Sequence, residues 1–201
     1  MIRILLAEDQ AMVRGALKAL LATEEDMTVV AEVSRGDQVM AAALAARPDV
    51  ALLDIEMPGL DGISAGTALR SAMPGCRTLI LTTFGKPGFL RRAMEAGASG
   101  FLLKDAPPEE LARAIRRTAR GERVVDPGLA ASALSEGASP LTERERQVLA
   151  ATDRGADIDE IAGTLFLSPG TVRNHLSAAI QKLAARNRAE AARIAEAKGW
   201  L

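Results

Sequence analysis

The first 120 residues alternate short apolar runs with longer segments of helical periodicity, and this alternation limits the possible folds more than any other feature. Five apolar runs have the length and composition of buried strands: residues 2–7, 28–33, 50–53, 78–81 and 100–103. The segments between them show helical spacing and are long enough to cross over to a parallel neighbour. The sequence therefore predicts an α/β domain built on a doubly wound, five-stranded parallel sheet.

The pattern changes after residue 120, so we place a domain boundary there. Residues 121–139 are rich in Gly, Ser, Ala and Pro and are predicted to form a linker that holds one short helix starting near Pro127. Residues 140–201 show only helical periodicity, with helices predicted at 142–153, 157–165, 169–184 and 187–198. Thr142 with Glu145 forms a capping box, and Ser168 followed by Pro169 is a second helix start. The second domain is thus predicted to be an all-α, four-helix unit.

Composition excludes several classes of protein and site. The chain of 201 residues has one cysteine, Cys76, and one histidine, His175, so it can form neither an internal disulfide nor a metal centre built from several Cys or His side chains. No window of 18 uninterrupted apolar residues occurs, and the first strand turns acidic after seven residues. We therefore expect a soluble, cytoplasmic protein without a membrane segment.

Polar side chains follow four of the predicted strands. Glu8 and Asp9 follow the first strand, Asp54 ends the third, and Thr82 and Lys104 end the fourth and fifth. In a parallel sheet all of these positions lie at one edge. Three crowded carboxylates repel one another and favour a hard divalent cation such as Mg²⁺, which makes a site receptive to a phosphoryl group. A hydroxyl and an ammonium nearby could then hold the phosphoryl oxygens.

Glu8-Asp9, Asp54, Thr82 and Lys104, with Phe101 three positions before the lysine, resemble the receiver domain of two-component response regulators over residues 1–120. The resemblance implies that a sensor histidine kinase phosphorylates Asp54. It also implies that Thr82 and Phe101 relay the change, and that Glu8, Asp9, Asp54 and the backbone carbonyl of Glu56 form the Mg²⁺ site. Asp105 stands where the family often has a proline.

The third helix of the second domain combines an apolar stripe with a basic, carboxylate-free surface. Val172, Leu176, Ala179, Ile180 and Leu183 form the stripe, and residues 168–188 contain four Lys or Arg and no Asp or Glu. A solvated basic face would show the same charge. A preceding short helix and tight turn, however, are typical of a recognition helix that enters the major groove of DNA.

The runs LTERERQVL, DEIAGTLFLSPGTVRNHL and QKL resemble the LuxR-type helix-turn-helix, so the whole chain resembles NarL/FixJ-class response regulators. The resemblance implies that phosphorylation promotes formation of a homodimer, that residues 188–197 serve for pairing, and that the chain is not an enzyme. It implies two groups of DNA contacts, one to bases or adjacent phosphates and one that positions the DNA backbone. The first group is Thr171, Arg173, Asn174 and Ser177, and the second is Ser168, His175 and Lys182.

Two other functions fit parts of the sequence. Asp54-Ile55-Glu56 is similar to the nucleophile motif of Mg²⁺-dependent aspartyl-phosphate phosphatases of the haloacid dehalogenase type, although those place the nucleophile after the first strand. A receiver fused to a protein-binding helical bundle would need no DNA. Within the response regulators, the segments AEDQ, DIEMPG and LTTFGKPG resemble the subgroup paired with membrane-fluidity-sensing kinases.

Overall fold

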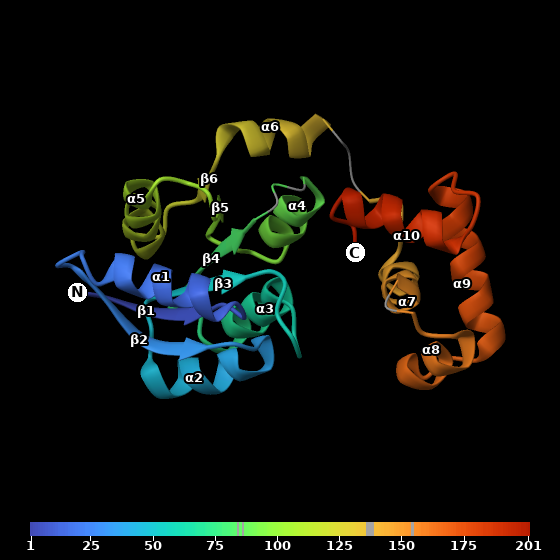
Figure 1. Ribbon diagram of the computed structural model, residues 1–201, viewed down its shortest axis with the longest axis horizontal. Coiled ribbons are helices and arrows are strands. Elements are labelled where there is room, and N and C mark those ends of the chain that lie inside the picture. The colour runs from blue at the N-terminus through green and yellow to red at the C-terminus, as the bar shows by residue number, and fades with distance from the viewer. Residues whose placement is uncertain (84, 86, 136–138, 154) are drawn as a thin grey trace. The chain divides into compact units, whose positions relative to one another are not determined.

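The computed structural model describes residues 1–83, 85, 87–135, 139–153 and 155–201. The chain divides into two compact units, the first formed by Met1–Gly85 and Leu90–Ala131 and the second mainly by Ser132–Leu201 (Figure 1).

The first unit is a parallel sheet with helices on both faces. The strand order is β2-β1-β3-β4-β5-β6 and every neighbouring pair is parallel. The strands are β1 (Ile2–Ala7), β2 (Met27–Val33), β3 (Val50–Asp54), β4 (Arg77–Thr82), β5 (Gly100–Leu103) and β6 (Val124–Val125). The helices are α1 (Ala11–Leu21), η1 (Gly36–Gln38), α2 (Val39–Ala46), α3 (Gly62–Ala72), α4 (Pro87–Glu95) and α5 (Pro108–Ala119). From β1 the chain adds β2 on one side and then β3 on the other, so the winding changes direction between β1 and β3. Doubly wound sheets bind their ligands at such a switch point.

The doubly wound sheet is confirmed, but the prediction of five strands was wrong by one. Val124 and Val125 pair in parallel with Gly100 and Phe101 of β5 and form a sixth strand at the edge of the sheet. Two residues are too short to show any periodicity, so this strand has no signal in the hydrophobic pattern. It lies inside the segment that was predicted to be a linker.

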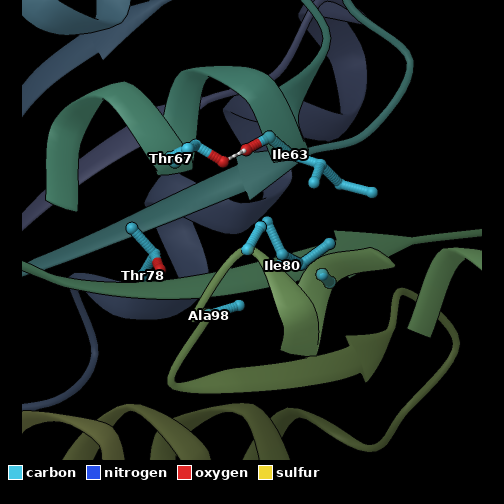
Figure 2. A pocket seen from close by; sticks show the side chains of 8 residues that line it. Ile63, Thr67, Thr78, Ile80 and Ala98 are labelled. Atoms are coloured by element: carbon cyan, nitrogen blue, oxygen red, sulfur yellow. Dashed lines mark hydrogen bonds between the residues drawn. The ribbon is translucent and has the colours of Figure 1, made fainter. Parts of the chain in front are cut away.

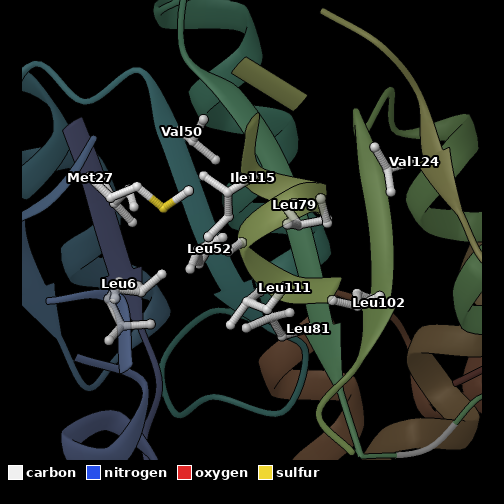
Figure 3. Close-up of a cluster of buried hydrophobic side chains, with 14 residues drawn as sticks. Leu6, Met27, Val50, Leu52, Leu79, Leu81, Leu102, Leu111, Ile115 and Val124 are labelled. Carbon is white, nitrogen blue, oxygen red and sulfur yellow. The ribbon is translucent and has the colours of Figure 1, made fainter. Parts of the chain in front are cut away.

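The core between the sheet and helices α1 and α5 consists of aliphatic side chains (Figure 3). Alternate residues of the strands, such as Leu6, Leu52 and Leu79, belong to one cluster with Leu111 and Ile115 of α5. Every residue of β3 is buried, as expected for a central strand covered on both faces. On the opposite face, side chains of α3, β4 and the segment from α4 to β5 line a small pocket (Figure 2). This packing fixes the strand ends that carry the polar residues.

The helices of the second unit lie close to their predicted ranges. They are α7 (Glu143–Asp153), α8 (Ile158–Leu165), α9 (Pro169–Lys182) and α10 (Arg188–Ala197), preceded by α6 (Pro127–Ser135), which begins where the sequence predicts a helix. The capping box of α7 is formed, since Glu145 N donates to Thr142 Oγ1 at 3.3 Å and Thr142 N donates to Glu145 Oε2 at 2.7 Å. Buried residues of α7 to α10, together with Trp200, make a separate core.

Neither the single cysteine nor any described helix changes what the composition predicts. Cys76 is buried, and burial raises the pKa of its thiol to about 11, so it stays protonated and unreactive at neutral pH. Within the described ranges, no helix combines the length and the apolar composition that crossing a bilayer requires.

Candidate functional site

Three carboxylates meet at the switch point of the sheet. Glu8 and Asp9 follow β1 directly, and Asp54 is the last residue of the neighbouring strand β3. Each contributes a carboxylate oxygen to a group whose members all lie within 4.8 Å of one another. Glu8 and Asp54 are buried, whereas Asp9 is exposed. The structure therefore brings together the three side chains that the sequence placed at one edge.

Lys104 bridges the two buried carboxylates. It follows β5, and its Nζ lies 2.6 Å from Glu8 Oε2 and 2.9 Å from Asp54 Oδ2. The lysine side chain is only 8% exposed. The other oxygen of Asp54, Oδ1, accepts a hydrogen bond from Ile55 N at 2.8 Å, and Glu8 Oε1 accepts one from Gln10 N at 3.2 Å. Lys104 thus pairs with two of the three clustered carboxylates.

Burial is the main cause of the pKa shifts of the two paired carboxylates. Burial raises the pKa of Asp54 and the pKa of Glu8, and the opposing interaction with Lys104 offsets only part of this rise. Burial alone would lower the pKa of Lys104, but its hydrogen bonds to Glu8 and Asp54 outweigh burial and raise that pKa. The lysine is therefore held as the cation, while the carboxylates favour further positive charge.

The remaining predicted residues of this site lie close to it in the fold. Thr82 is the last residue of β4 and is buried, and its carbonyl accepts a hydrogen bond from Lys104 N at 2.8 Å. Phe101 lies fully buried on β5, opposite Ile80 of β4. Glu56 is exposed two residues beyond Asp54. The relay through Thr82 and Phe101, and a role for the Glu56 carbonyl, stay predictions.

Two glycines that the sequence analysis missed allow close backbone contacts with the segment that follows Asp54. A Cβ at Gly62, the first residue of α3, would lie 1.8 Å from the Asp54 carbonyl oxygen, and one at Gly36 would lie 1.8 Å from the Leu60 carbonyl oxygen. Neither position tolerates a side chain unless the backbone shifts. Asp61 caps α3 by accepting hydrogen bonds from Ile63 N and Ser64 N, both at 3.0 Å. The close approach of these backbones fixes Asp54 relative to α3.

The second site is the exposed surface of α9. Val172, Leu176 and Ala179 are buried in the core, as predicted, and Ile180 and Leu183 are partly buried against it. Among the predicted DNA contacts, Ser168, Arg173, Asn174, Ser177 and Lys182 are exposed, and Thr171 and His175 are half-buried. Ser168 caps α9, because its Oγ accepts a hydrogen bond from Thr171 N at 3.1 Å. Three of the four base-reading candidates, Arg173, Asn174 and Ser177, are thus exposed on α9.

Lys182 makes an ion pair that the sequence did not reveal. Its Nζ lies 2.9 Å from Oε1 and 2.7 Å from Oε2 of Glu145, a buried residue of α7. The same carboxylate accepts the Thr142 N–H of the capping box. Lys182 therefore ties the last turn of α9 to the start of α7.

Both parts of the chain match known families. Residues 4–116 match the response regulator receiver domain, and residues 139–195 match the bacterial regulatory proteins of the luxR family. The chain belongs to the NarL/FixJ-class response regulators. Its first domain is therefore a receiver and its second a LuxR-type helix-turn-helix, and the chain is a DNA-binding response regulator.

Full-length relatives support this assignment. The chain is 46% identical over 201 residues to the uncharacterized transcriptional regulatory protein YvfU of Bacillus subtilis, and each chain is covered completely. It is also 46% identical over 200 residues to the transcriptional regulatory protein DesR of the same organism, with 100% of this chain and 99% of the relative covered.

A solved structure of similar length agrees. The response regulator ChrA of a heme-sensing two-component system superposes with a TM-score of 0.59 and 37% identity, covering 100% of this chain and 98% of that chain. These similarities favour neither a phosphatase of the haloacid dehalogenase type nor a helical bundle that binds only proteins.

Proposed function

We propose that a sensor histidine kinase phosphorylates Asp54 and that this modification promotes dimerisation and binding of α9 to promoter DNA, in the compartment that holds the chromosome. The observation that supports the receiver step is the Lys104 bridge, because it holds a cation 2.9 Å from Asp54, the carboxylate that ends the central strand β3. Glu8 is the other partner of Lys104, and Asp9 completes the group of carboxylates.

The carboxylate group suits a magnesium ion. Glu8, Asp9 and Asp54 offer oxygen ligands within 4.8 Å of one another, and a divalent cation would relieve the repulsion between their carboxylates. We propose that these residues, with the Glu56 carbonyl, hold Mg²⁺. When bound, the ion would neutralise the charge that repels a phosphoryl donor.

The protein groups have separate roles in the transfer. An oxygen of Asp54 attacks the phosphorus, the bond from phosphorus to the kinase imidazole nitrogen breaks, and an acyl phosphate forms on Asp54. Lys104 then has phosphoryl oxygens as partners in place of the Asp54 carboxylate, and the Thr82 hydroxyl is the proposed donor beside them. Thr82 ends β4 beside Lys104, and Phe101 lies on β5 three residues before it, so we propose that these two side chains respond when Lys104 changes partners.

DNA binding that depends on phosphorylation tests the whole proposal. Short duplexes are first enriched from a random library by the full chain treated with beryllofluoride and Mg²⁺, and their affinities are then measured with and without the treatment. We expect the treatment to strengthen binding at least about tenfold, because a dimer contacts two half-sites at once. Failure to enrich any duplex would contradict the proposal, and so would an affinity that the treatment leaves unchanged.

We expect beryllofluoride to shift the protein from monomer to dimer. The physical reason is that DNA-binding modules of this type read two half-sites related by the symmetry of the dimer. Sedimentation velocity of the full chain over a range of concentrations measures the shift, and the Asp54→Asn variant, which lacks the acceptor, is the control. A treated protein that stays monomeric at every concentration would count against dimerisation.

Lys182→Ala is expected to lower the free energy of unfolding of the second domain by about 1–3 kcal/mol, because it leaves the buried Glu145 carboxylate without its cation. The chain has a single tryptophan, Trp200, and it lies in that domain's core, so its fluorescence during urea unfolding reports on this domain. Gln181→Ala, at an exposed neighbouring position, is the matched control. If Lys182→Ala unfolds like Gln181→Ala, the pair does not stabilise the domain.

A further inference from the structure

Phe166 is the most exposed large apolar side chain that the structure describes. It is 94% exposed, whereas Phe89 and Phe101 are buried. Leu165 and Leu167, its neighbours on either side, are partly buried against the core of the second unit. The turn between α8 and α9 therefore directs two leucines inward and the phenylalanine into solvent.

The backbone at this position makes a phenylalanine unexpected. Phe166 is the C-cap of α8 and has the left-handed conformation, with φ 55° and ψ 47°. Its N–H donates to the Ala162 and Gly163 carbonyls, and Leu167 N donates to the Ala162 carbonyl at 2.9 Å. Glycine is the usual residue in this kind of cap because it has no Cβ to strain. Neither packing nor backbone geometry explains the aromatic ring.

The position of Phe166 indicates what the ring contacts. It lies two residues before Ser168, the N-cap of the recognition helix α9, so it is continuous with the DNA-binding surface. The acidic residues of α8 are confined to its N-cap and first turn, and eight helical residues span about 12 Å. Residues 161–189 contain no Asp or Glu. A polyanion can therefore approach this end of α8 without meeting a carboxylate from that segment.

We propose that Phe166 is a DNA contact that packs on an apolar group at the edge of the site read by α9. DNA offers two such groups, the thymine methyl in the major groove and the deoxyribose of the backbone. This inference rests on the proposed promoter binding and adds a contact outside the recognition helix. A contact of this kind releases no counterions, so it adds affinity without adding salt dependence.

Substituting Phe166 with glycine separates a DNA contact from a structural role. Phe166→Gly relieves the left-handed backbone and is expected to raise the melting temperature of the second domain, followed through Trp200 fluorescence. The same variant, and Phe166→Ala, should bind the enriched duplex about tenfold more weakly, with an unchanged slope of affinity against salt. A residue that only supports the fold would not move stability and affinity in opposite directions.

The matched control is Leu44→Ala, which removes an exposed apolar side chain from α2 of the receiver and should leave DNA affinity unchanged. Duplexes with uracil in place of thymine distinguish the two DNA groups. If the wild type loses affinity for them and Phe166→Ala does not, the ring contacts a thymine methyl. If uracil has no effect while Phe166→Ala still binds weakly, the ring contacts deoxyribose.

Two outcomes would overturn the inference. One is a Phe166→Gly variant that binds the duplex as tightly as the wild type. The other is a variant that leaves the DNA affinity unchanged and alters only the sedimentation of the protein without DNA. That result would place the ring at a contact between two copies of the chain. Enrichment of a duplex by the wild type is measured first. If no duplex is enriched, the proposed function fails; if one is enriched and the Phe166 variants bind it as tightly as the wild type, only the inference about Phe166 fails.

Discussion

Asp54→Asn is expected to reduce phosphate incorporation from a small-molecule phosphodonor to background, whereas the wild type takes up one phosphate per chain. The amide lacks the nucleophilic oxygen, and no other carboxylate has the same position. Glu8 and Asp9 both follow β1 and do not end the central strand β3; Glu8 is fully buried against Lys104, and Asp9 is exposed. Intact-protein mass spectrometry after incubation with the donor and Mg²⁺ measures the result.

Asp105→Asn is the matched control for this experiment. It makes the same chemical change on an exposed acid next to Lys104, and the variant should be labelled as the wild type is. Chelation of the divalent cation should also abolish labelling of the wild type, because the clustered carboxylates would repel the incoming dianion. Asp54→Asn labelled to the wild-type level would show that the acceptor is another residue.

The sheet could be predicted because its signal is local. Each of the five longer strands is an apolar run bounded by polar residues, and the crossover segments carry helical spacing. β6 could not be predicted, since Val124 and Val125 become a strand only through pairing with β5. The starts of α7 and α9 were predictable for a different reason: capping depends on residues three positions apart in the chain.

The site could be predicted only in part. Strand ends of a parallel sheet converge, so the positions of Glu8, Asp9, Asp54 and Lys104 followed from topology. The ion pair between Glu145 and Lys182 joins residues 37 positions apart, and it depends on how α7 and α9 pack. The need for glycine at positions 36 and 62 likewise arises from loops that approach in space. The Asp-Gly pair before α3 was a visible turn signal, but it did not show that Gly62 lies against Asp54.

Arg173→Ala is expected to weaken binding to the enriched duplex by about 1–3 kcal/mol, roughly fivefold to 150-fold, and to weaken binding to a scrambled duplex much less. Arg173 is exposed in the second turn of α9, where side chains of a recognition helix reach base edges. An arginine that reads guanine adds affinity only where that base is present. Titrations of both duplexes at several salt concentrations give the specificity ratio and the salt slope.

Arg144→Ala is the control, because Arg144 is an exposed arginine on α7, outside the recognition helix. It removes the same charge, so any general electrostatic effect appears in both variants. If Arg173→Ala leaves the ratio of specific to scrambled affinity unchanged and lowers the salt slope by about one ion, Arg173 contacts a phosphate. Base reading would then have to come from Asn174, Thr171 or Ser177, of which Asn174 and Ser177 are as accessible as Arg173 on the exposed side of α9.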